Sequence, residues 1–255
     1  MRRIFTLAVL CAAAVGCGQT TSDVFYGTVG NPTGGKLVSI EVNGGNKVTI
    51  TPIGEMGAFG CNALARSSDG TLYTVCGLGL FKPDQPQQLA TVDPKTGRAT
   101  TFGKGVTGLA VMSLEFAPDG TLYAVGDGNP ASPTFNSLYT VDVKSGEFAP
   151  VGPTGVPAPD FFMDFAFDSS GTMYGATSRG LFTIDRKSGT ATKVTDFVGG
   201  GDIMGLAYNA DHNKLYATEY RPSNSAMYTV DTKTGFLTPV AAMGFPLAHG
   251  LVPGK

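Results

Sequence analysis

The chain has 255 residues, and its 42% hydrophobic content is enough to bury a sizeable core in one or two domains. Its 36 glycines and 16 prolines indicate a fold with many turns. The formal net charge is −2, and no cluster of Lys or Arg follows the first three residues, so nucleic acid is not an expected partner.

Residues 1–17 have the layout of an export signal. Arg2 and Arg3 precede an apolar run over 4–15, and small residues lead up to Cys17. The run is too short to serve well as a transmembrane helix. The segment AVGC that ends at Cys17 resembles the lipobox of bacterial lipoproteins, in which the cysteine is lipidated and becomes the new N-terminus. We therefore expect a lipoprotein signal peptide over 1–17 and a polar tether over 18–23, with a plainly cleaved secretory signal as the alternative.

A unit of four short strands lies at residues 113–152. Its apolar runs are separated by Pro-Asp-Gly, by a longer stretch rich in Gly, Asn, Pro and Ser, and by Lys-Ser-Gly. These residue types favour chain reversal, because they supply a positive or a preset φ. The unit has two apolar faces and cannot bury both by itself, so copies of it are expected to pack face to face. The apolar runs are 114–116, 122–125, 138–141 and 148–151.

The unit occurs five times. Each copy has a tyrosine at the same place in its second strand, and the tyrosines recur at intervals of 42 to 51 residues, close to the length of a four-stranded propeller blade. The third strands give the same count, with starts at Leu37, Leu89, Leu138, Leu181 and Met227. The repeated tyrosines are Tyr26, Tyr73, Tyr123, Tyr174 and Tyr216.

The first strands indicate how the array closes. Such strands begin at residues 62, 112, 163 and 204, but none precedes the copy at Val24. The missing strand is HGLVP, which starts at His249 near the C-terminus. We therefore predict a single all-β domain over 24–255, a five-bladed β-propeller of four-stranded blades whose C-terminal strand joins the N-terminal blade and closes the ring.

The motifs also carry a family resemblance. FAPDGTLY at Phe116–Tyr123 and LYTVDVKSG at Leu138–Gly146 resemble segments of the bacterial NHL, YVTN and quinoprotein-like propeller repeats. The resemblance spans Val24 to Pro253 and implies the fold. It implies no particular activity, because those superfamilies include enzymes, receptors and scaffolds.

Repeated acidic residues are interpreted as turn residues rather than calcium ligands. Asp93, Asp142, Asp185 and Asp231 each end a third strand and are followed by a Gly four positions later. An Asp side chain in this position bonds backbone N–H groups two or three residues on, and the Gly takes the left-handed conformation.

The cysteines divide between signal and domain. Cys11 and Cys17 belong to the signal, which leaves Cys61 and Cys76 in the mature chain. If the turn at 67–70 pairs Arg66 with Thr71, the same antiparallel register places Cys61 opposite Cys76. We predict a disulfide between them, in keeping with an oxidising compartment.

The long connections are expected on one face of the propeller. Loops from second to third strands and loops between blades share that face and hold all the long segments, which suits a binding surface on a rigid scaffold. The aromatic, amide and charged residues there form the predicted binding face, although any of the aromatics could instead cap the core. The candidates are Phe81, Phe135, Asn136, Asp160, Phe161, Phe162, Tyr220 and Arg221.

Two metal hypotheses concern the central axis. Met112, Met163, Met204 and His249 occupy equivalent first-strand positions and could offer a soft Cu(I) site, although methionine there more often fills a narrow axis. A lactonase-like metal site would need oxygen ligands, for which the candidates are Asn62, Glu115, Asp164 and Asp202. No cofactor is expected, and a quinone would lack the tryptophan on which it usually rests, since the chain has none.

The sequence favours a binding role over catalysis. The domain has only His212 and His249, and no motif places a nucleophile beside either. We expect an exported, lipid-anchored monomer, at the outer membrane or cell surface, that binds an envelope protein, a glycan or a small ligand through its long-loop face. The alternative is a periplasmic metal-dependent hydrolase or lactonase that uses axial carboxylates.

Overall fold

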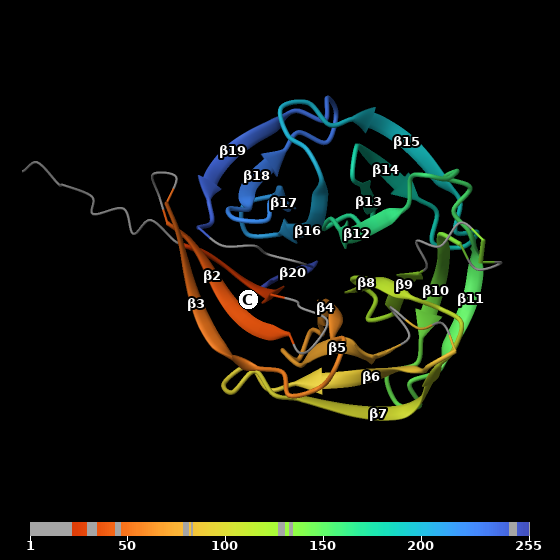
Figure 1. The fold of residues 1–255 in the computed structure, drawn as a ribbon. Coiled ribbons are helices and arrows are strands. Elements are labelled where there is room, and N and C mark those ends of the chain that lie inside the picture. The colour runs from red at the N-terminus through yellow and green to blue at the C-terminus, as the bar shows by residue number, and fades with distance from the viewer. Residues whose placement is uncertain are drawn as a thin grey trace, which may run out of the picture.

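The computed structural model describes residues 22–29, 35–43, 47–78, 82, 84–126, 131–132, 135–244 and 249–254. Twenty β-strands form five four-stranded antiparallel sheets arranged as a ring, and the described residues contain no α-helix. Figure 1 shows the sheets as five blades around a central axis. The predicted five-bladed β-propeller is therefore confirmed.

Each blade runs from an inner strand at the axis to an outer strand at the rim. The strands of the first two blades, from inside to outside, are β20 (His249–Pro253), β1 (Asp23–Val29), β2 (Lys36–Asn43) and β3 (Lys47–Glu55), then β4 (Asn62–Arg66), β5 (Leu72–Gly77), β6 (Gln87–Val92) and β7 (Ala99–Val106).

In each of the other three blades, the four strands follow one another in sequence from the axis to the rim. Their strands are β8 (Val111–Phe116), β9 (Leu122–Gly126), β10 (Ser137–Val141) and β11 (Phe148–Pro153); β12 (Phe162–Phe167), β13 (Met173–Thr177), β14 (Gly180–Ile184) and β15 (Ala191–Asp196); and β16 (Ile203–Asn209), β17 (Lys214–Glu219), β18 (Ala226–Val230) and β19 (Leu237–Ala242).

The C-terminal strand closes the ring as predicted. β20 pairs antiparallel with β1, and Tyr26 lies opposite Val252. The first blade is therefore built from both ends of the chain, and the edge of β1 that faces the axis is paired with β20 instead of being left open. β1 begins at Asp23, one residue before the expected start of the propeller.

The core is divided among the contacts between blades. Five clusters of buried apolar side chains are found among the described residues, and each lies between two neighbouring blades. One of them joins Phe25 of the first blade to Tyr216 of the last, with ring centroids 4.9 Å apart. Because every blade buries both of its faces against neighbours, no blade is expected to be stable by itself.

The repeated Asp-to-Gly turns connect third to fourth strands and also join the blades. In blade three, Asp142 Oδ1 accepts a hydrogen bond from the Lys144 N–H at 2.7 Å, and Gly146 has a φ of 68°. In blade four, a Cβ added to Gly189 would stand 2.5 Å from the carbonyl oxygen of Gly152 in blade three. The glycine is thus required by the close approach of two blades as well as by its positive φ.

The Cys61–Cys76 disulfide is formed, which confirms its prediction. The assumed register was wrong by one residue at the turn, because Ser67 bonds to Thr71 and Arg66 lies opposite Leu72. A register shift between Asn62 and Ala65 then places Asn62 opposite Val75. This shift of one residue cancels the error at the turn. Cys61, which precedes Asn62, therefore lies opposite Cys76, as predicted.

Candidate functional site

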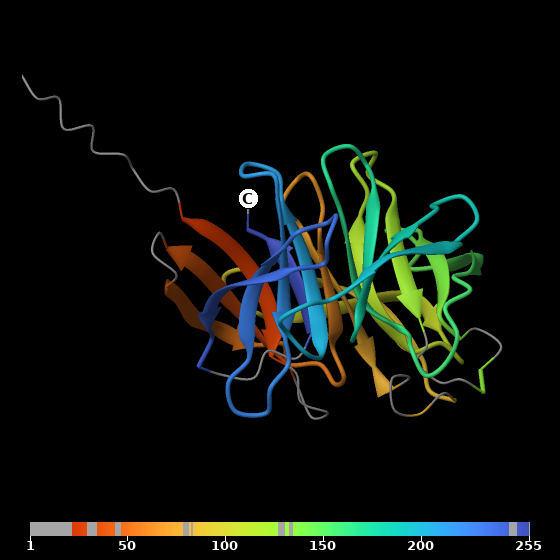
Figure 2. The ribbon, with the colours of Figure 1, turned by 90° about the horizontal axis from the view of Figure 1, so that it is seen from above.

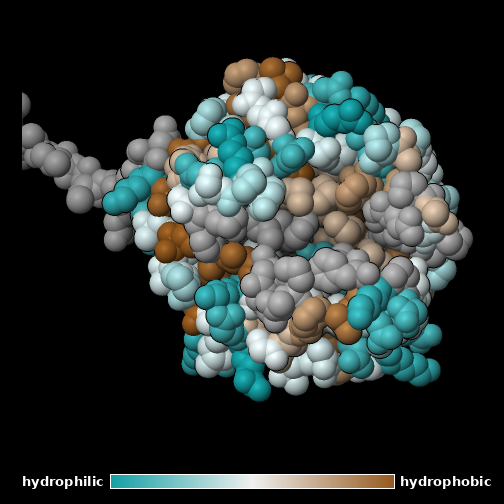
Figure 3. All heavy atoms as spheres, in the orientation of Figure 1, coloured by the Kyte–Doolittle hydropathy of each residue, from teal (hydrophilic) through white to brown (hydrophobic). Residues whose placement is uncertain are grey.

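The long connections gather on one face of the ring. Figure 2 shows the loops between second and third strands and between blades on the lower side, and the C-terminus on the opposite side. Figure 3 views the long-loop face directly and shows apolar atoms around a hollow near its middle, where Figure 1 places β12 and β16. The described residues around this hollow come from blades four and five.

The hollow has a volume of about 260 Å³ and lies at the inner ends of β12 and β16. Two methionines and two aromatic residues surround it, together with a serine and an aspartate. Such a cavity is slightly smaller than the roughly 300–1,000 Å³ of sites for drug-sized ligands. Its lining includes Phe161, Met163, Ser178, Asp202, Met204 and Tyr220.

A second hollow of about 310 Å³ continues outward toward the rim. Ser178 and Asp202 line both hollows, so the two are neighbours with a shared wall. The outer hollow is also bordered by Phe197 and by the exposed backbone of Gly200 and Gly201. We call the two hollows together the blade 4–5 groove.

The loop that carries Asp202 is held from both sides. The Tyr220 N–H donates to the Asp202 carbonyl oxygen at 2.9 Å, and the Gly201 N–H donates to Glu219 Oε1 at 3.1 Å. Glu219 is itself buried and accepts bonds from Tyr228 Oη at 2.6 Å and from Arg221 at 2.9 Å. Burial alone would raise the pKa of Glu219, but these hydrogen bonds together outweigh it and lower the pKa, so Glu219 stays ionised and anchors the loop.

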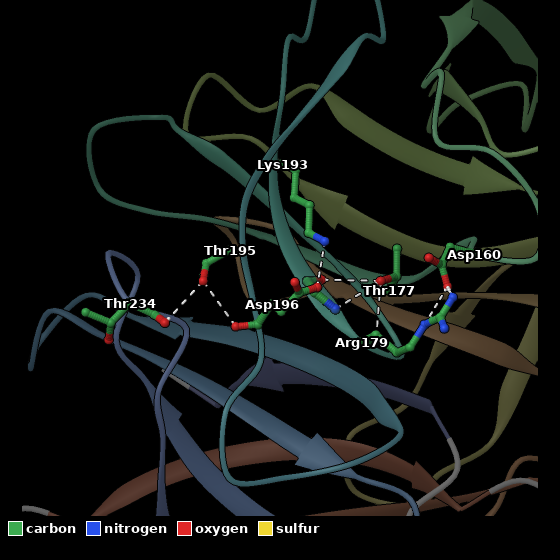
Figure 4. A network of polar contacts seen from close by, with 8 residues as sticks. Asp160, Thr177, Arg179, Lys193, Thr195, Asp196 and Thr234 are labelled. Carbon is green, nitrogen blue, oxygen red and sulfur yellow. Dashed lines mark hydrogen bonds and ion pairs between the residues drawn. The ribbon is translucent and has the colours of Figure 1, made fainter.

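Ion pairs define the other wall of the groove. Arg179 donates from Nε and Nη2 to Asp160 Oδ1, at 3.1 and 2.7 Å, and its backbone N–H bonds to Thr177 Oγ1. Lys193 pairs with Asp196 at 2.6 Å. Figure 4 shows both pairs along one side of blade four. The contacts of Arg179 fix the β13–β14 turn that supplies Ser178.

Several predicted face residues lie at the groove. Phe161 and Tyr220 line it, while Asp160 and Arg221 fix its walls through their ion pairs. Phe135 is partly exposed on the neighbouring blade. Phe81 lies outside the described residues.

Two predicted face residues are structural instead. The Phe162 ring is 1% exposed and packs edge-on against Phe182, because the first residue of β12 points into the core. Asn136 is 2% exposed, and its side chain accepts from the Phe162 N–H at 2.9 Å and donates to the Val156 carbonyl. Neither side chain reaches the surface where a ligand would lie.

At the axis, Asp164 of β12 connects the inner strands of several blades. Its carboxylate accepts hydrogen bonds from Ser113 Oγ, from the backbone N–H of Phe165 and of Leu206, and from that of Leu251. Burial raises the pKa of Asp164 to about 7. Burial and the nearby Asp164 raise the pKa of Glu115 well above its usual value. Both carboxylate oxygens of Asp164 accept hydrogen bonds, so the main role of this side chain is to hold the inner strands together.

The soft-metal residues do not converge as one set. Met163 and Met204 share the inner hollow, but Met112 packs against the cluster between blades three and four. The side chain of His249 lies outside the described residues, although its backbone belongs to β20. Of the oxygen candidates, Asn62 is buried and donates to the Val111 carbonyl at 2.9 Å. Within the described part of the chain, no group of three or more His, Cys, Asp and Glu could hold a metal ion.

Sequence reasoning missed a polar cluster on the opposite face. The buried carboxylate of Asp23 accepts hydrogen bonds from Tyr216 Oη and, at 2.9 Å, from Asn209 Nδ2, and it contacts His212 Nδ1 at 2.5 Å. A cavity of about 400 Å³ lies beside it. The sequence pattern assigns Asp23 to the tether, and the large separation from its partners leaves no local signal of the contact.

Comparison with known proteins identifies the chain as a propeller repeat protein. The family model described as "Repeat of unknown function (DUF6923)" matches residues 25–242. The chain belongs to this family. No curated protein matches the sequence.

Solved structures share the fold at low identity. A chain of a nidogen/laminin complex is 11% identical, with a TM-score of 0.56, over 92% of this chain and 99% of that one. A gluconolactonase from Xanthomonas campestris is 12% identical, with a TM-score of 0.51, over 91% and 80%. A virginiamycin B lyase from Staphylococcus aureus is 15% identical, with a TM-score of 0.45, over 83% and 68%. The first two likenesses describe architecture and assign no activity.

Proposed function

We propose that the protein is an exported, lipid-anchored binding module that receives its ligand in the blade 4–5 groove. The observation that carries this proposal is the groove itself, in which aromatic, thioether and charged groups from separate loops meet over a rigid scaffold. The groove lies on the long-loop face, where the sequence predicted binding.

Export is supported by the disulfide. Cys61 and Cys76 are bonded, and such bonds persist in oxidising compartments. In this proposal Cys17 carries the lipid, and residues 18–22 link it to β1. The described residues include no helix long and apolar enough to cross a bilayer. Replacing Cys17 with Ser is expected to release the protein from the membrane fraction, and the N-terminal peptide of the wild type is expected to carry the mass of the lipid.

The binding role is tested with the full-length protein in its native envelope. Ligand captured by the wild type is compared with that captured by Phe161→Ala and Tyr220→Ala, which remove the aromatic walls. Glu147→Gln is the control, because Glu147 is exposed in the β10–β11 turn on the opposite face. Loss of capture in the groove variants alone supports the proposal, whereas equal capture by all variants contradicts it.

A metal-dependent hydrolase or lactonase is the second candidate. The observation that favours it is the meeting of two carboxyl groups with raised pKa, Asp164 and Glu115, at the axis. Glu115→Gln tests it without removing the hydrogen bonds of Asp164. Stoichiometric divalent metal and lactone hydrolysis in the wild type, both lost in Glu115→Gln, would favour the enzyme; an inert, metal-free protein that still captures its ligand would favour the binding module.

A further inference from the structure

Among the described residues, the charges around the blade 4–5 groove leave one carboxylate without a paired cation. Asp160 is paired with Arg179, Asp196 with Lys193, and Glu219 with Arg221. Asp202 is exposed and makes no ion pair with any residue in the described ranges. Its backbone accepts a hydrogen bond from Tyr220, which keeps this residue at the wall that the two hollows share.

The inner hollow suits the stem of a basic group. Phe161 and Tyr220 offer aromatic rings, and Met163 and Met204 offer polarizable thioethers. Aromatic faces attract ammonium and guanidinium groups, and a long basic side chain packs its methylenes on apolar surface while its charged head stays at a polar edge. A volume of about 260 Å³ matches a side chain better than a whole drug-sized molecule.

The outer hollow gives room for the chain that carries such a group. Gly200 and Gly201 are exposed and line this hollow with backbone, so a polypeptide can lie against them. From these observations we infer that the groove binds an arginine or lysine side chain of a polypeptide, with the charged head at Asp202 and the stem between Phe161 and Tyr220. This inference rests on the proposed function and specifies its ligand.

Arginine is the better probe of the two basic residues. Its planar guanidinium both stacks on aromatic rings and bonds a carboxylate through two N–H groups. Citrulline has the same shape without the charge. A labelled peptide Gly-Gly-Arg-Gly-Gly, blocked at both ends, is therefore compared with its citrulline twin by fluorescence anisotropy on the full-length protein.

We expect the arginine peptide to bind the wild type on the order of tenfold or more tightly than the citrulline peptide, since only the guanidinium places a positive charge beside the Asp202 carboxylate. Asp202→Asn removes the charge with little change of shape and is expected to abolish that preference. Glu147→Gln, on the opposite face, is expected to retain it. The preference is also expected to weaken at high salt, because the groove is open to solvent.

The outcomes separate this inference from the proposed function. Equal binding of the two peptides, or a preference that survives Asp202→Asn, overturns the inference even if Tyr220→Ala still loses the native ligand. Agmatine that competes as strongly as the arginine peptide would show that the groove takes a free small cation, which overturns the polypeptide assignment. Native capture unaffected by Phe161→Ala and Tyr220→Ala overturns the proposed function itself.

Discussion

The Asp164 carboxylate of β12 accepts a hydrogen bond from the Leu206 backbone N–H of β16 at 2.8 Å, so a side chain of blade four holds the inner strand of blade five. The same carboxylate accepts from Ser113 in blade three and from Leu251 in β20. One ionisable group therefore links four of the five blades at the axis. Its protonation should influence the stability of the whole ring.

The first prediction concerns pH. The pKa of Asp164 rises from 3.8 to about 7 on folding, so the folded state holds this proton more tightly than the unfolded state. A raised pKa contributes stability that is fully present below about pH 4 and is lost as the pH rises to 7. We expect the free energy of unfolding to fall across this window, by up to about 4 kcal/mol from Asp164, as measured by urea titration at a series of pH values.

Asp164→Asn provides the control for this prediction. The variant cannot titrate at residue 164, so its stability should depend less on pH between 4 and 7, whatever its absolute stability. Glu115 contributes a slope of the same sign, because its pKa is also raised. The turn aspartates act in a lower pH range, since their lowered pKa values contribute stability that is lost only as the pH falls below about 4. Equal slopes in wild type and variant would contradict the prediction.

The second prediction concerns the attachment of β1 to blade five. Tyr216 donates to Asp23, and this bond is made between buried groups 193 residues apart in sequence. Tyr216→Phe leaves one carboxylate oxygen short of a donor, which should lower the free energy of unfolding by about 1–3 kcal/mol. Tyr174→Phe is the matched control, because this repeat-equivalent hydroxyl makes no hydrogen bond to a described residue that would be lost. The idea fails if the two variants lose equal stability in urea.

The third prediction concerns the contact between outer turns and the preceding blade. Gly189 and Gly171 have nearly the same positive φ, 81° and 85°, but only Gly189 faces another backbone, that of Gly152. Gly171→Ala should therefore lower the free energy of unfolding by about 1–2 kcal/mol, because alanine disfavours the positive φ. Gly189→Ala should lower it by a further ~1–3 kcal/mol, because the new methyl group would push the turn away from the Gly152 backbone of blade three. Thermal unfolding of the two variants gives the comparison, and equal losses would mean that the blades are not in close contact there.

Local patterns were sufficient to predict the propeller. The strands of each blade lie close in sequence, and their turns carry Asp and Gly for reasons that act within a few residues. Even the ring closure could be inferred, because the inner strand absent before Val24 reappears at His249. The exact register was harder to predict. The register shift between Asn62 and Ala65 has no sequence signal. Cys61 lies opposite Cys76 only because this shift cancels the one-residue error in the predicted turn.

The candidate site was predicted only in part, because it depends on contacts between blades. Long loops indicated the face on which the groove lies, and Phe161 and Tyr220 line a hollow there. The same reasoning could not tell Phe161 from Phe162, whose side chains point to opposite sides of the chain, one toward the groove and one into the core. The cluster around Asp23 was missed because its partners lie 186 or more residues away.

The last prediction concerns the disulfide. Cys61 and Cys76 are 15 residues apart, and closing a loop of that size should stabilise the fold by about 3 kcal/mol, mainly by restricting the unfolded chain. The two sulfurs are also buried between blades one and two, so Cys61→Ala with Cys76→Ala removes packing as well as the cross-link. Urea unfolding of the wild type with and without reductant isolates the cross-link, and the double variant should not respond to reductant. Complete alkylation of both thiols in unreduced, unfolded protein would show that the bond is absent and would also remove the support it gives to export.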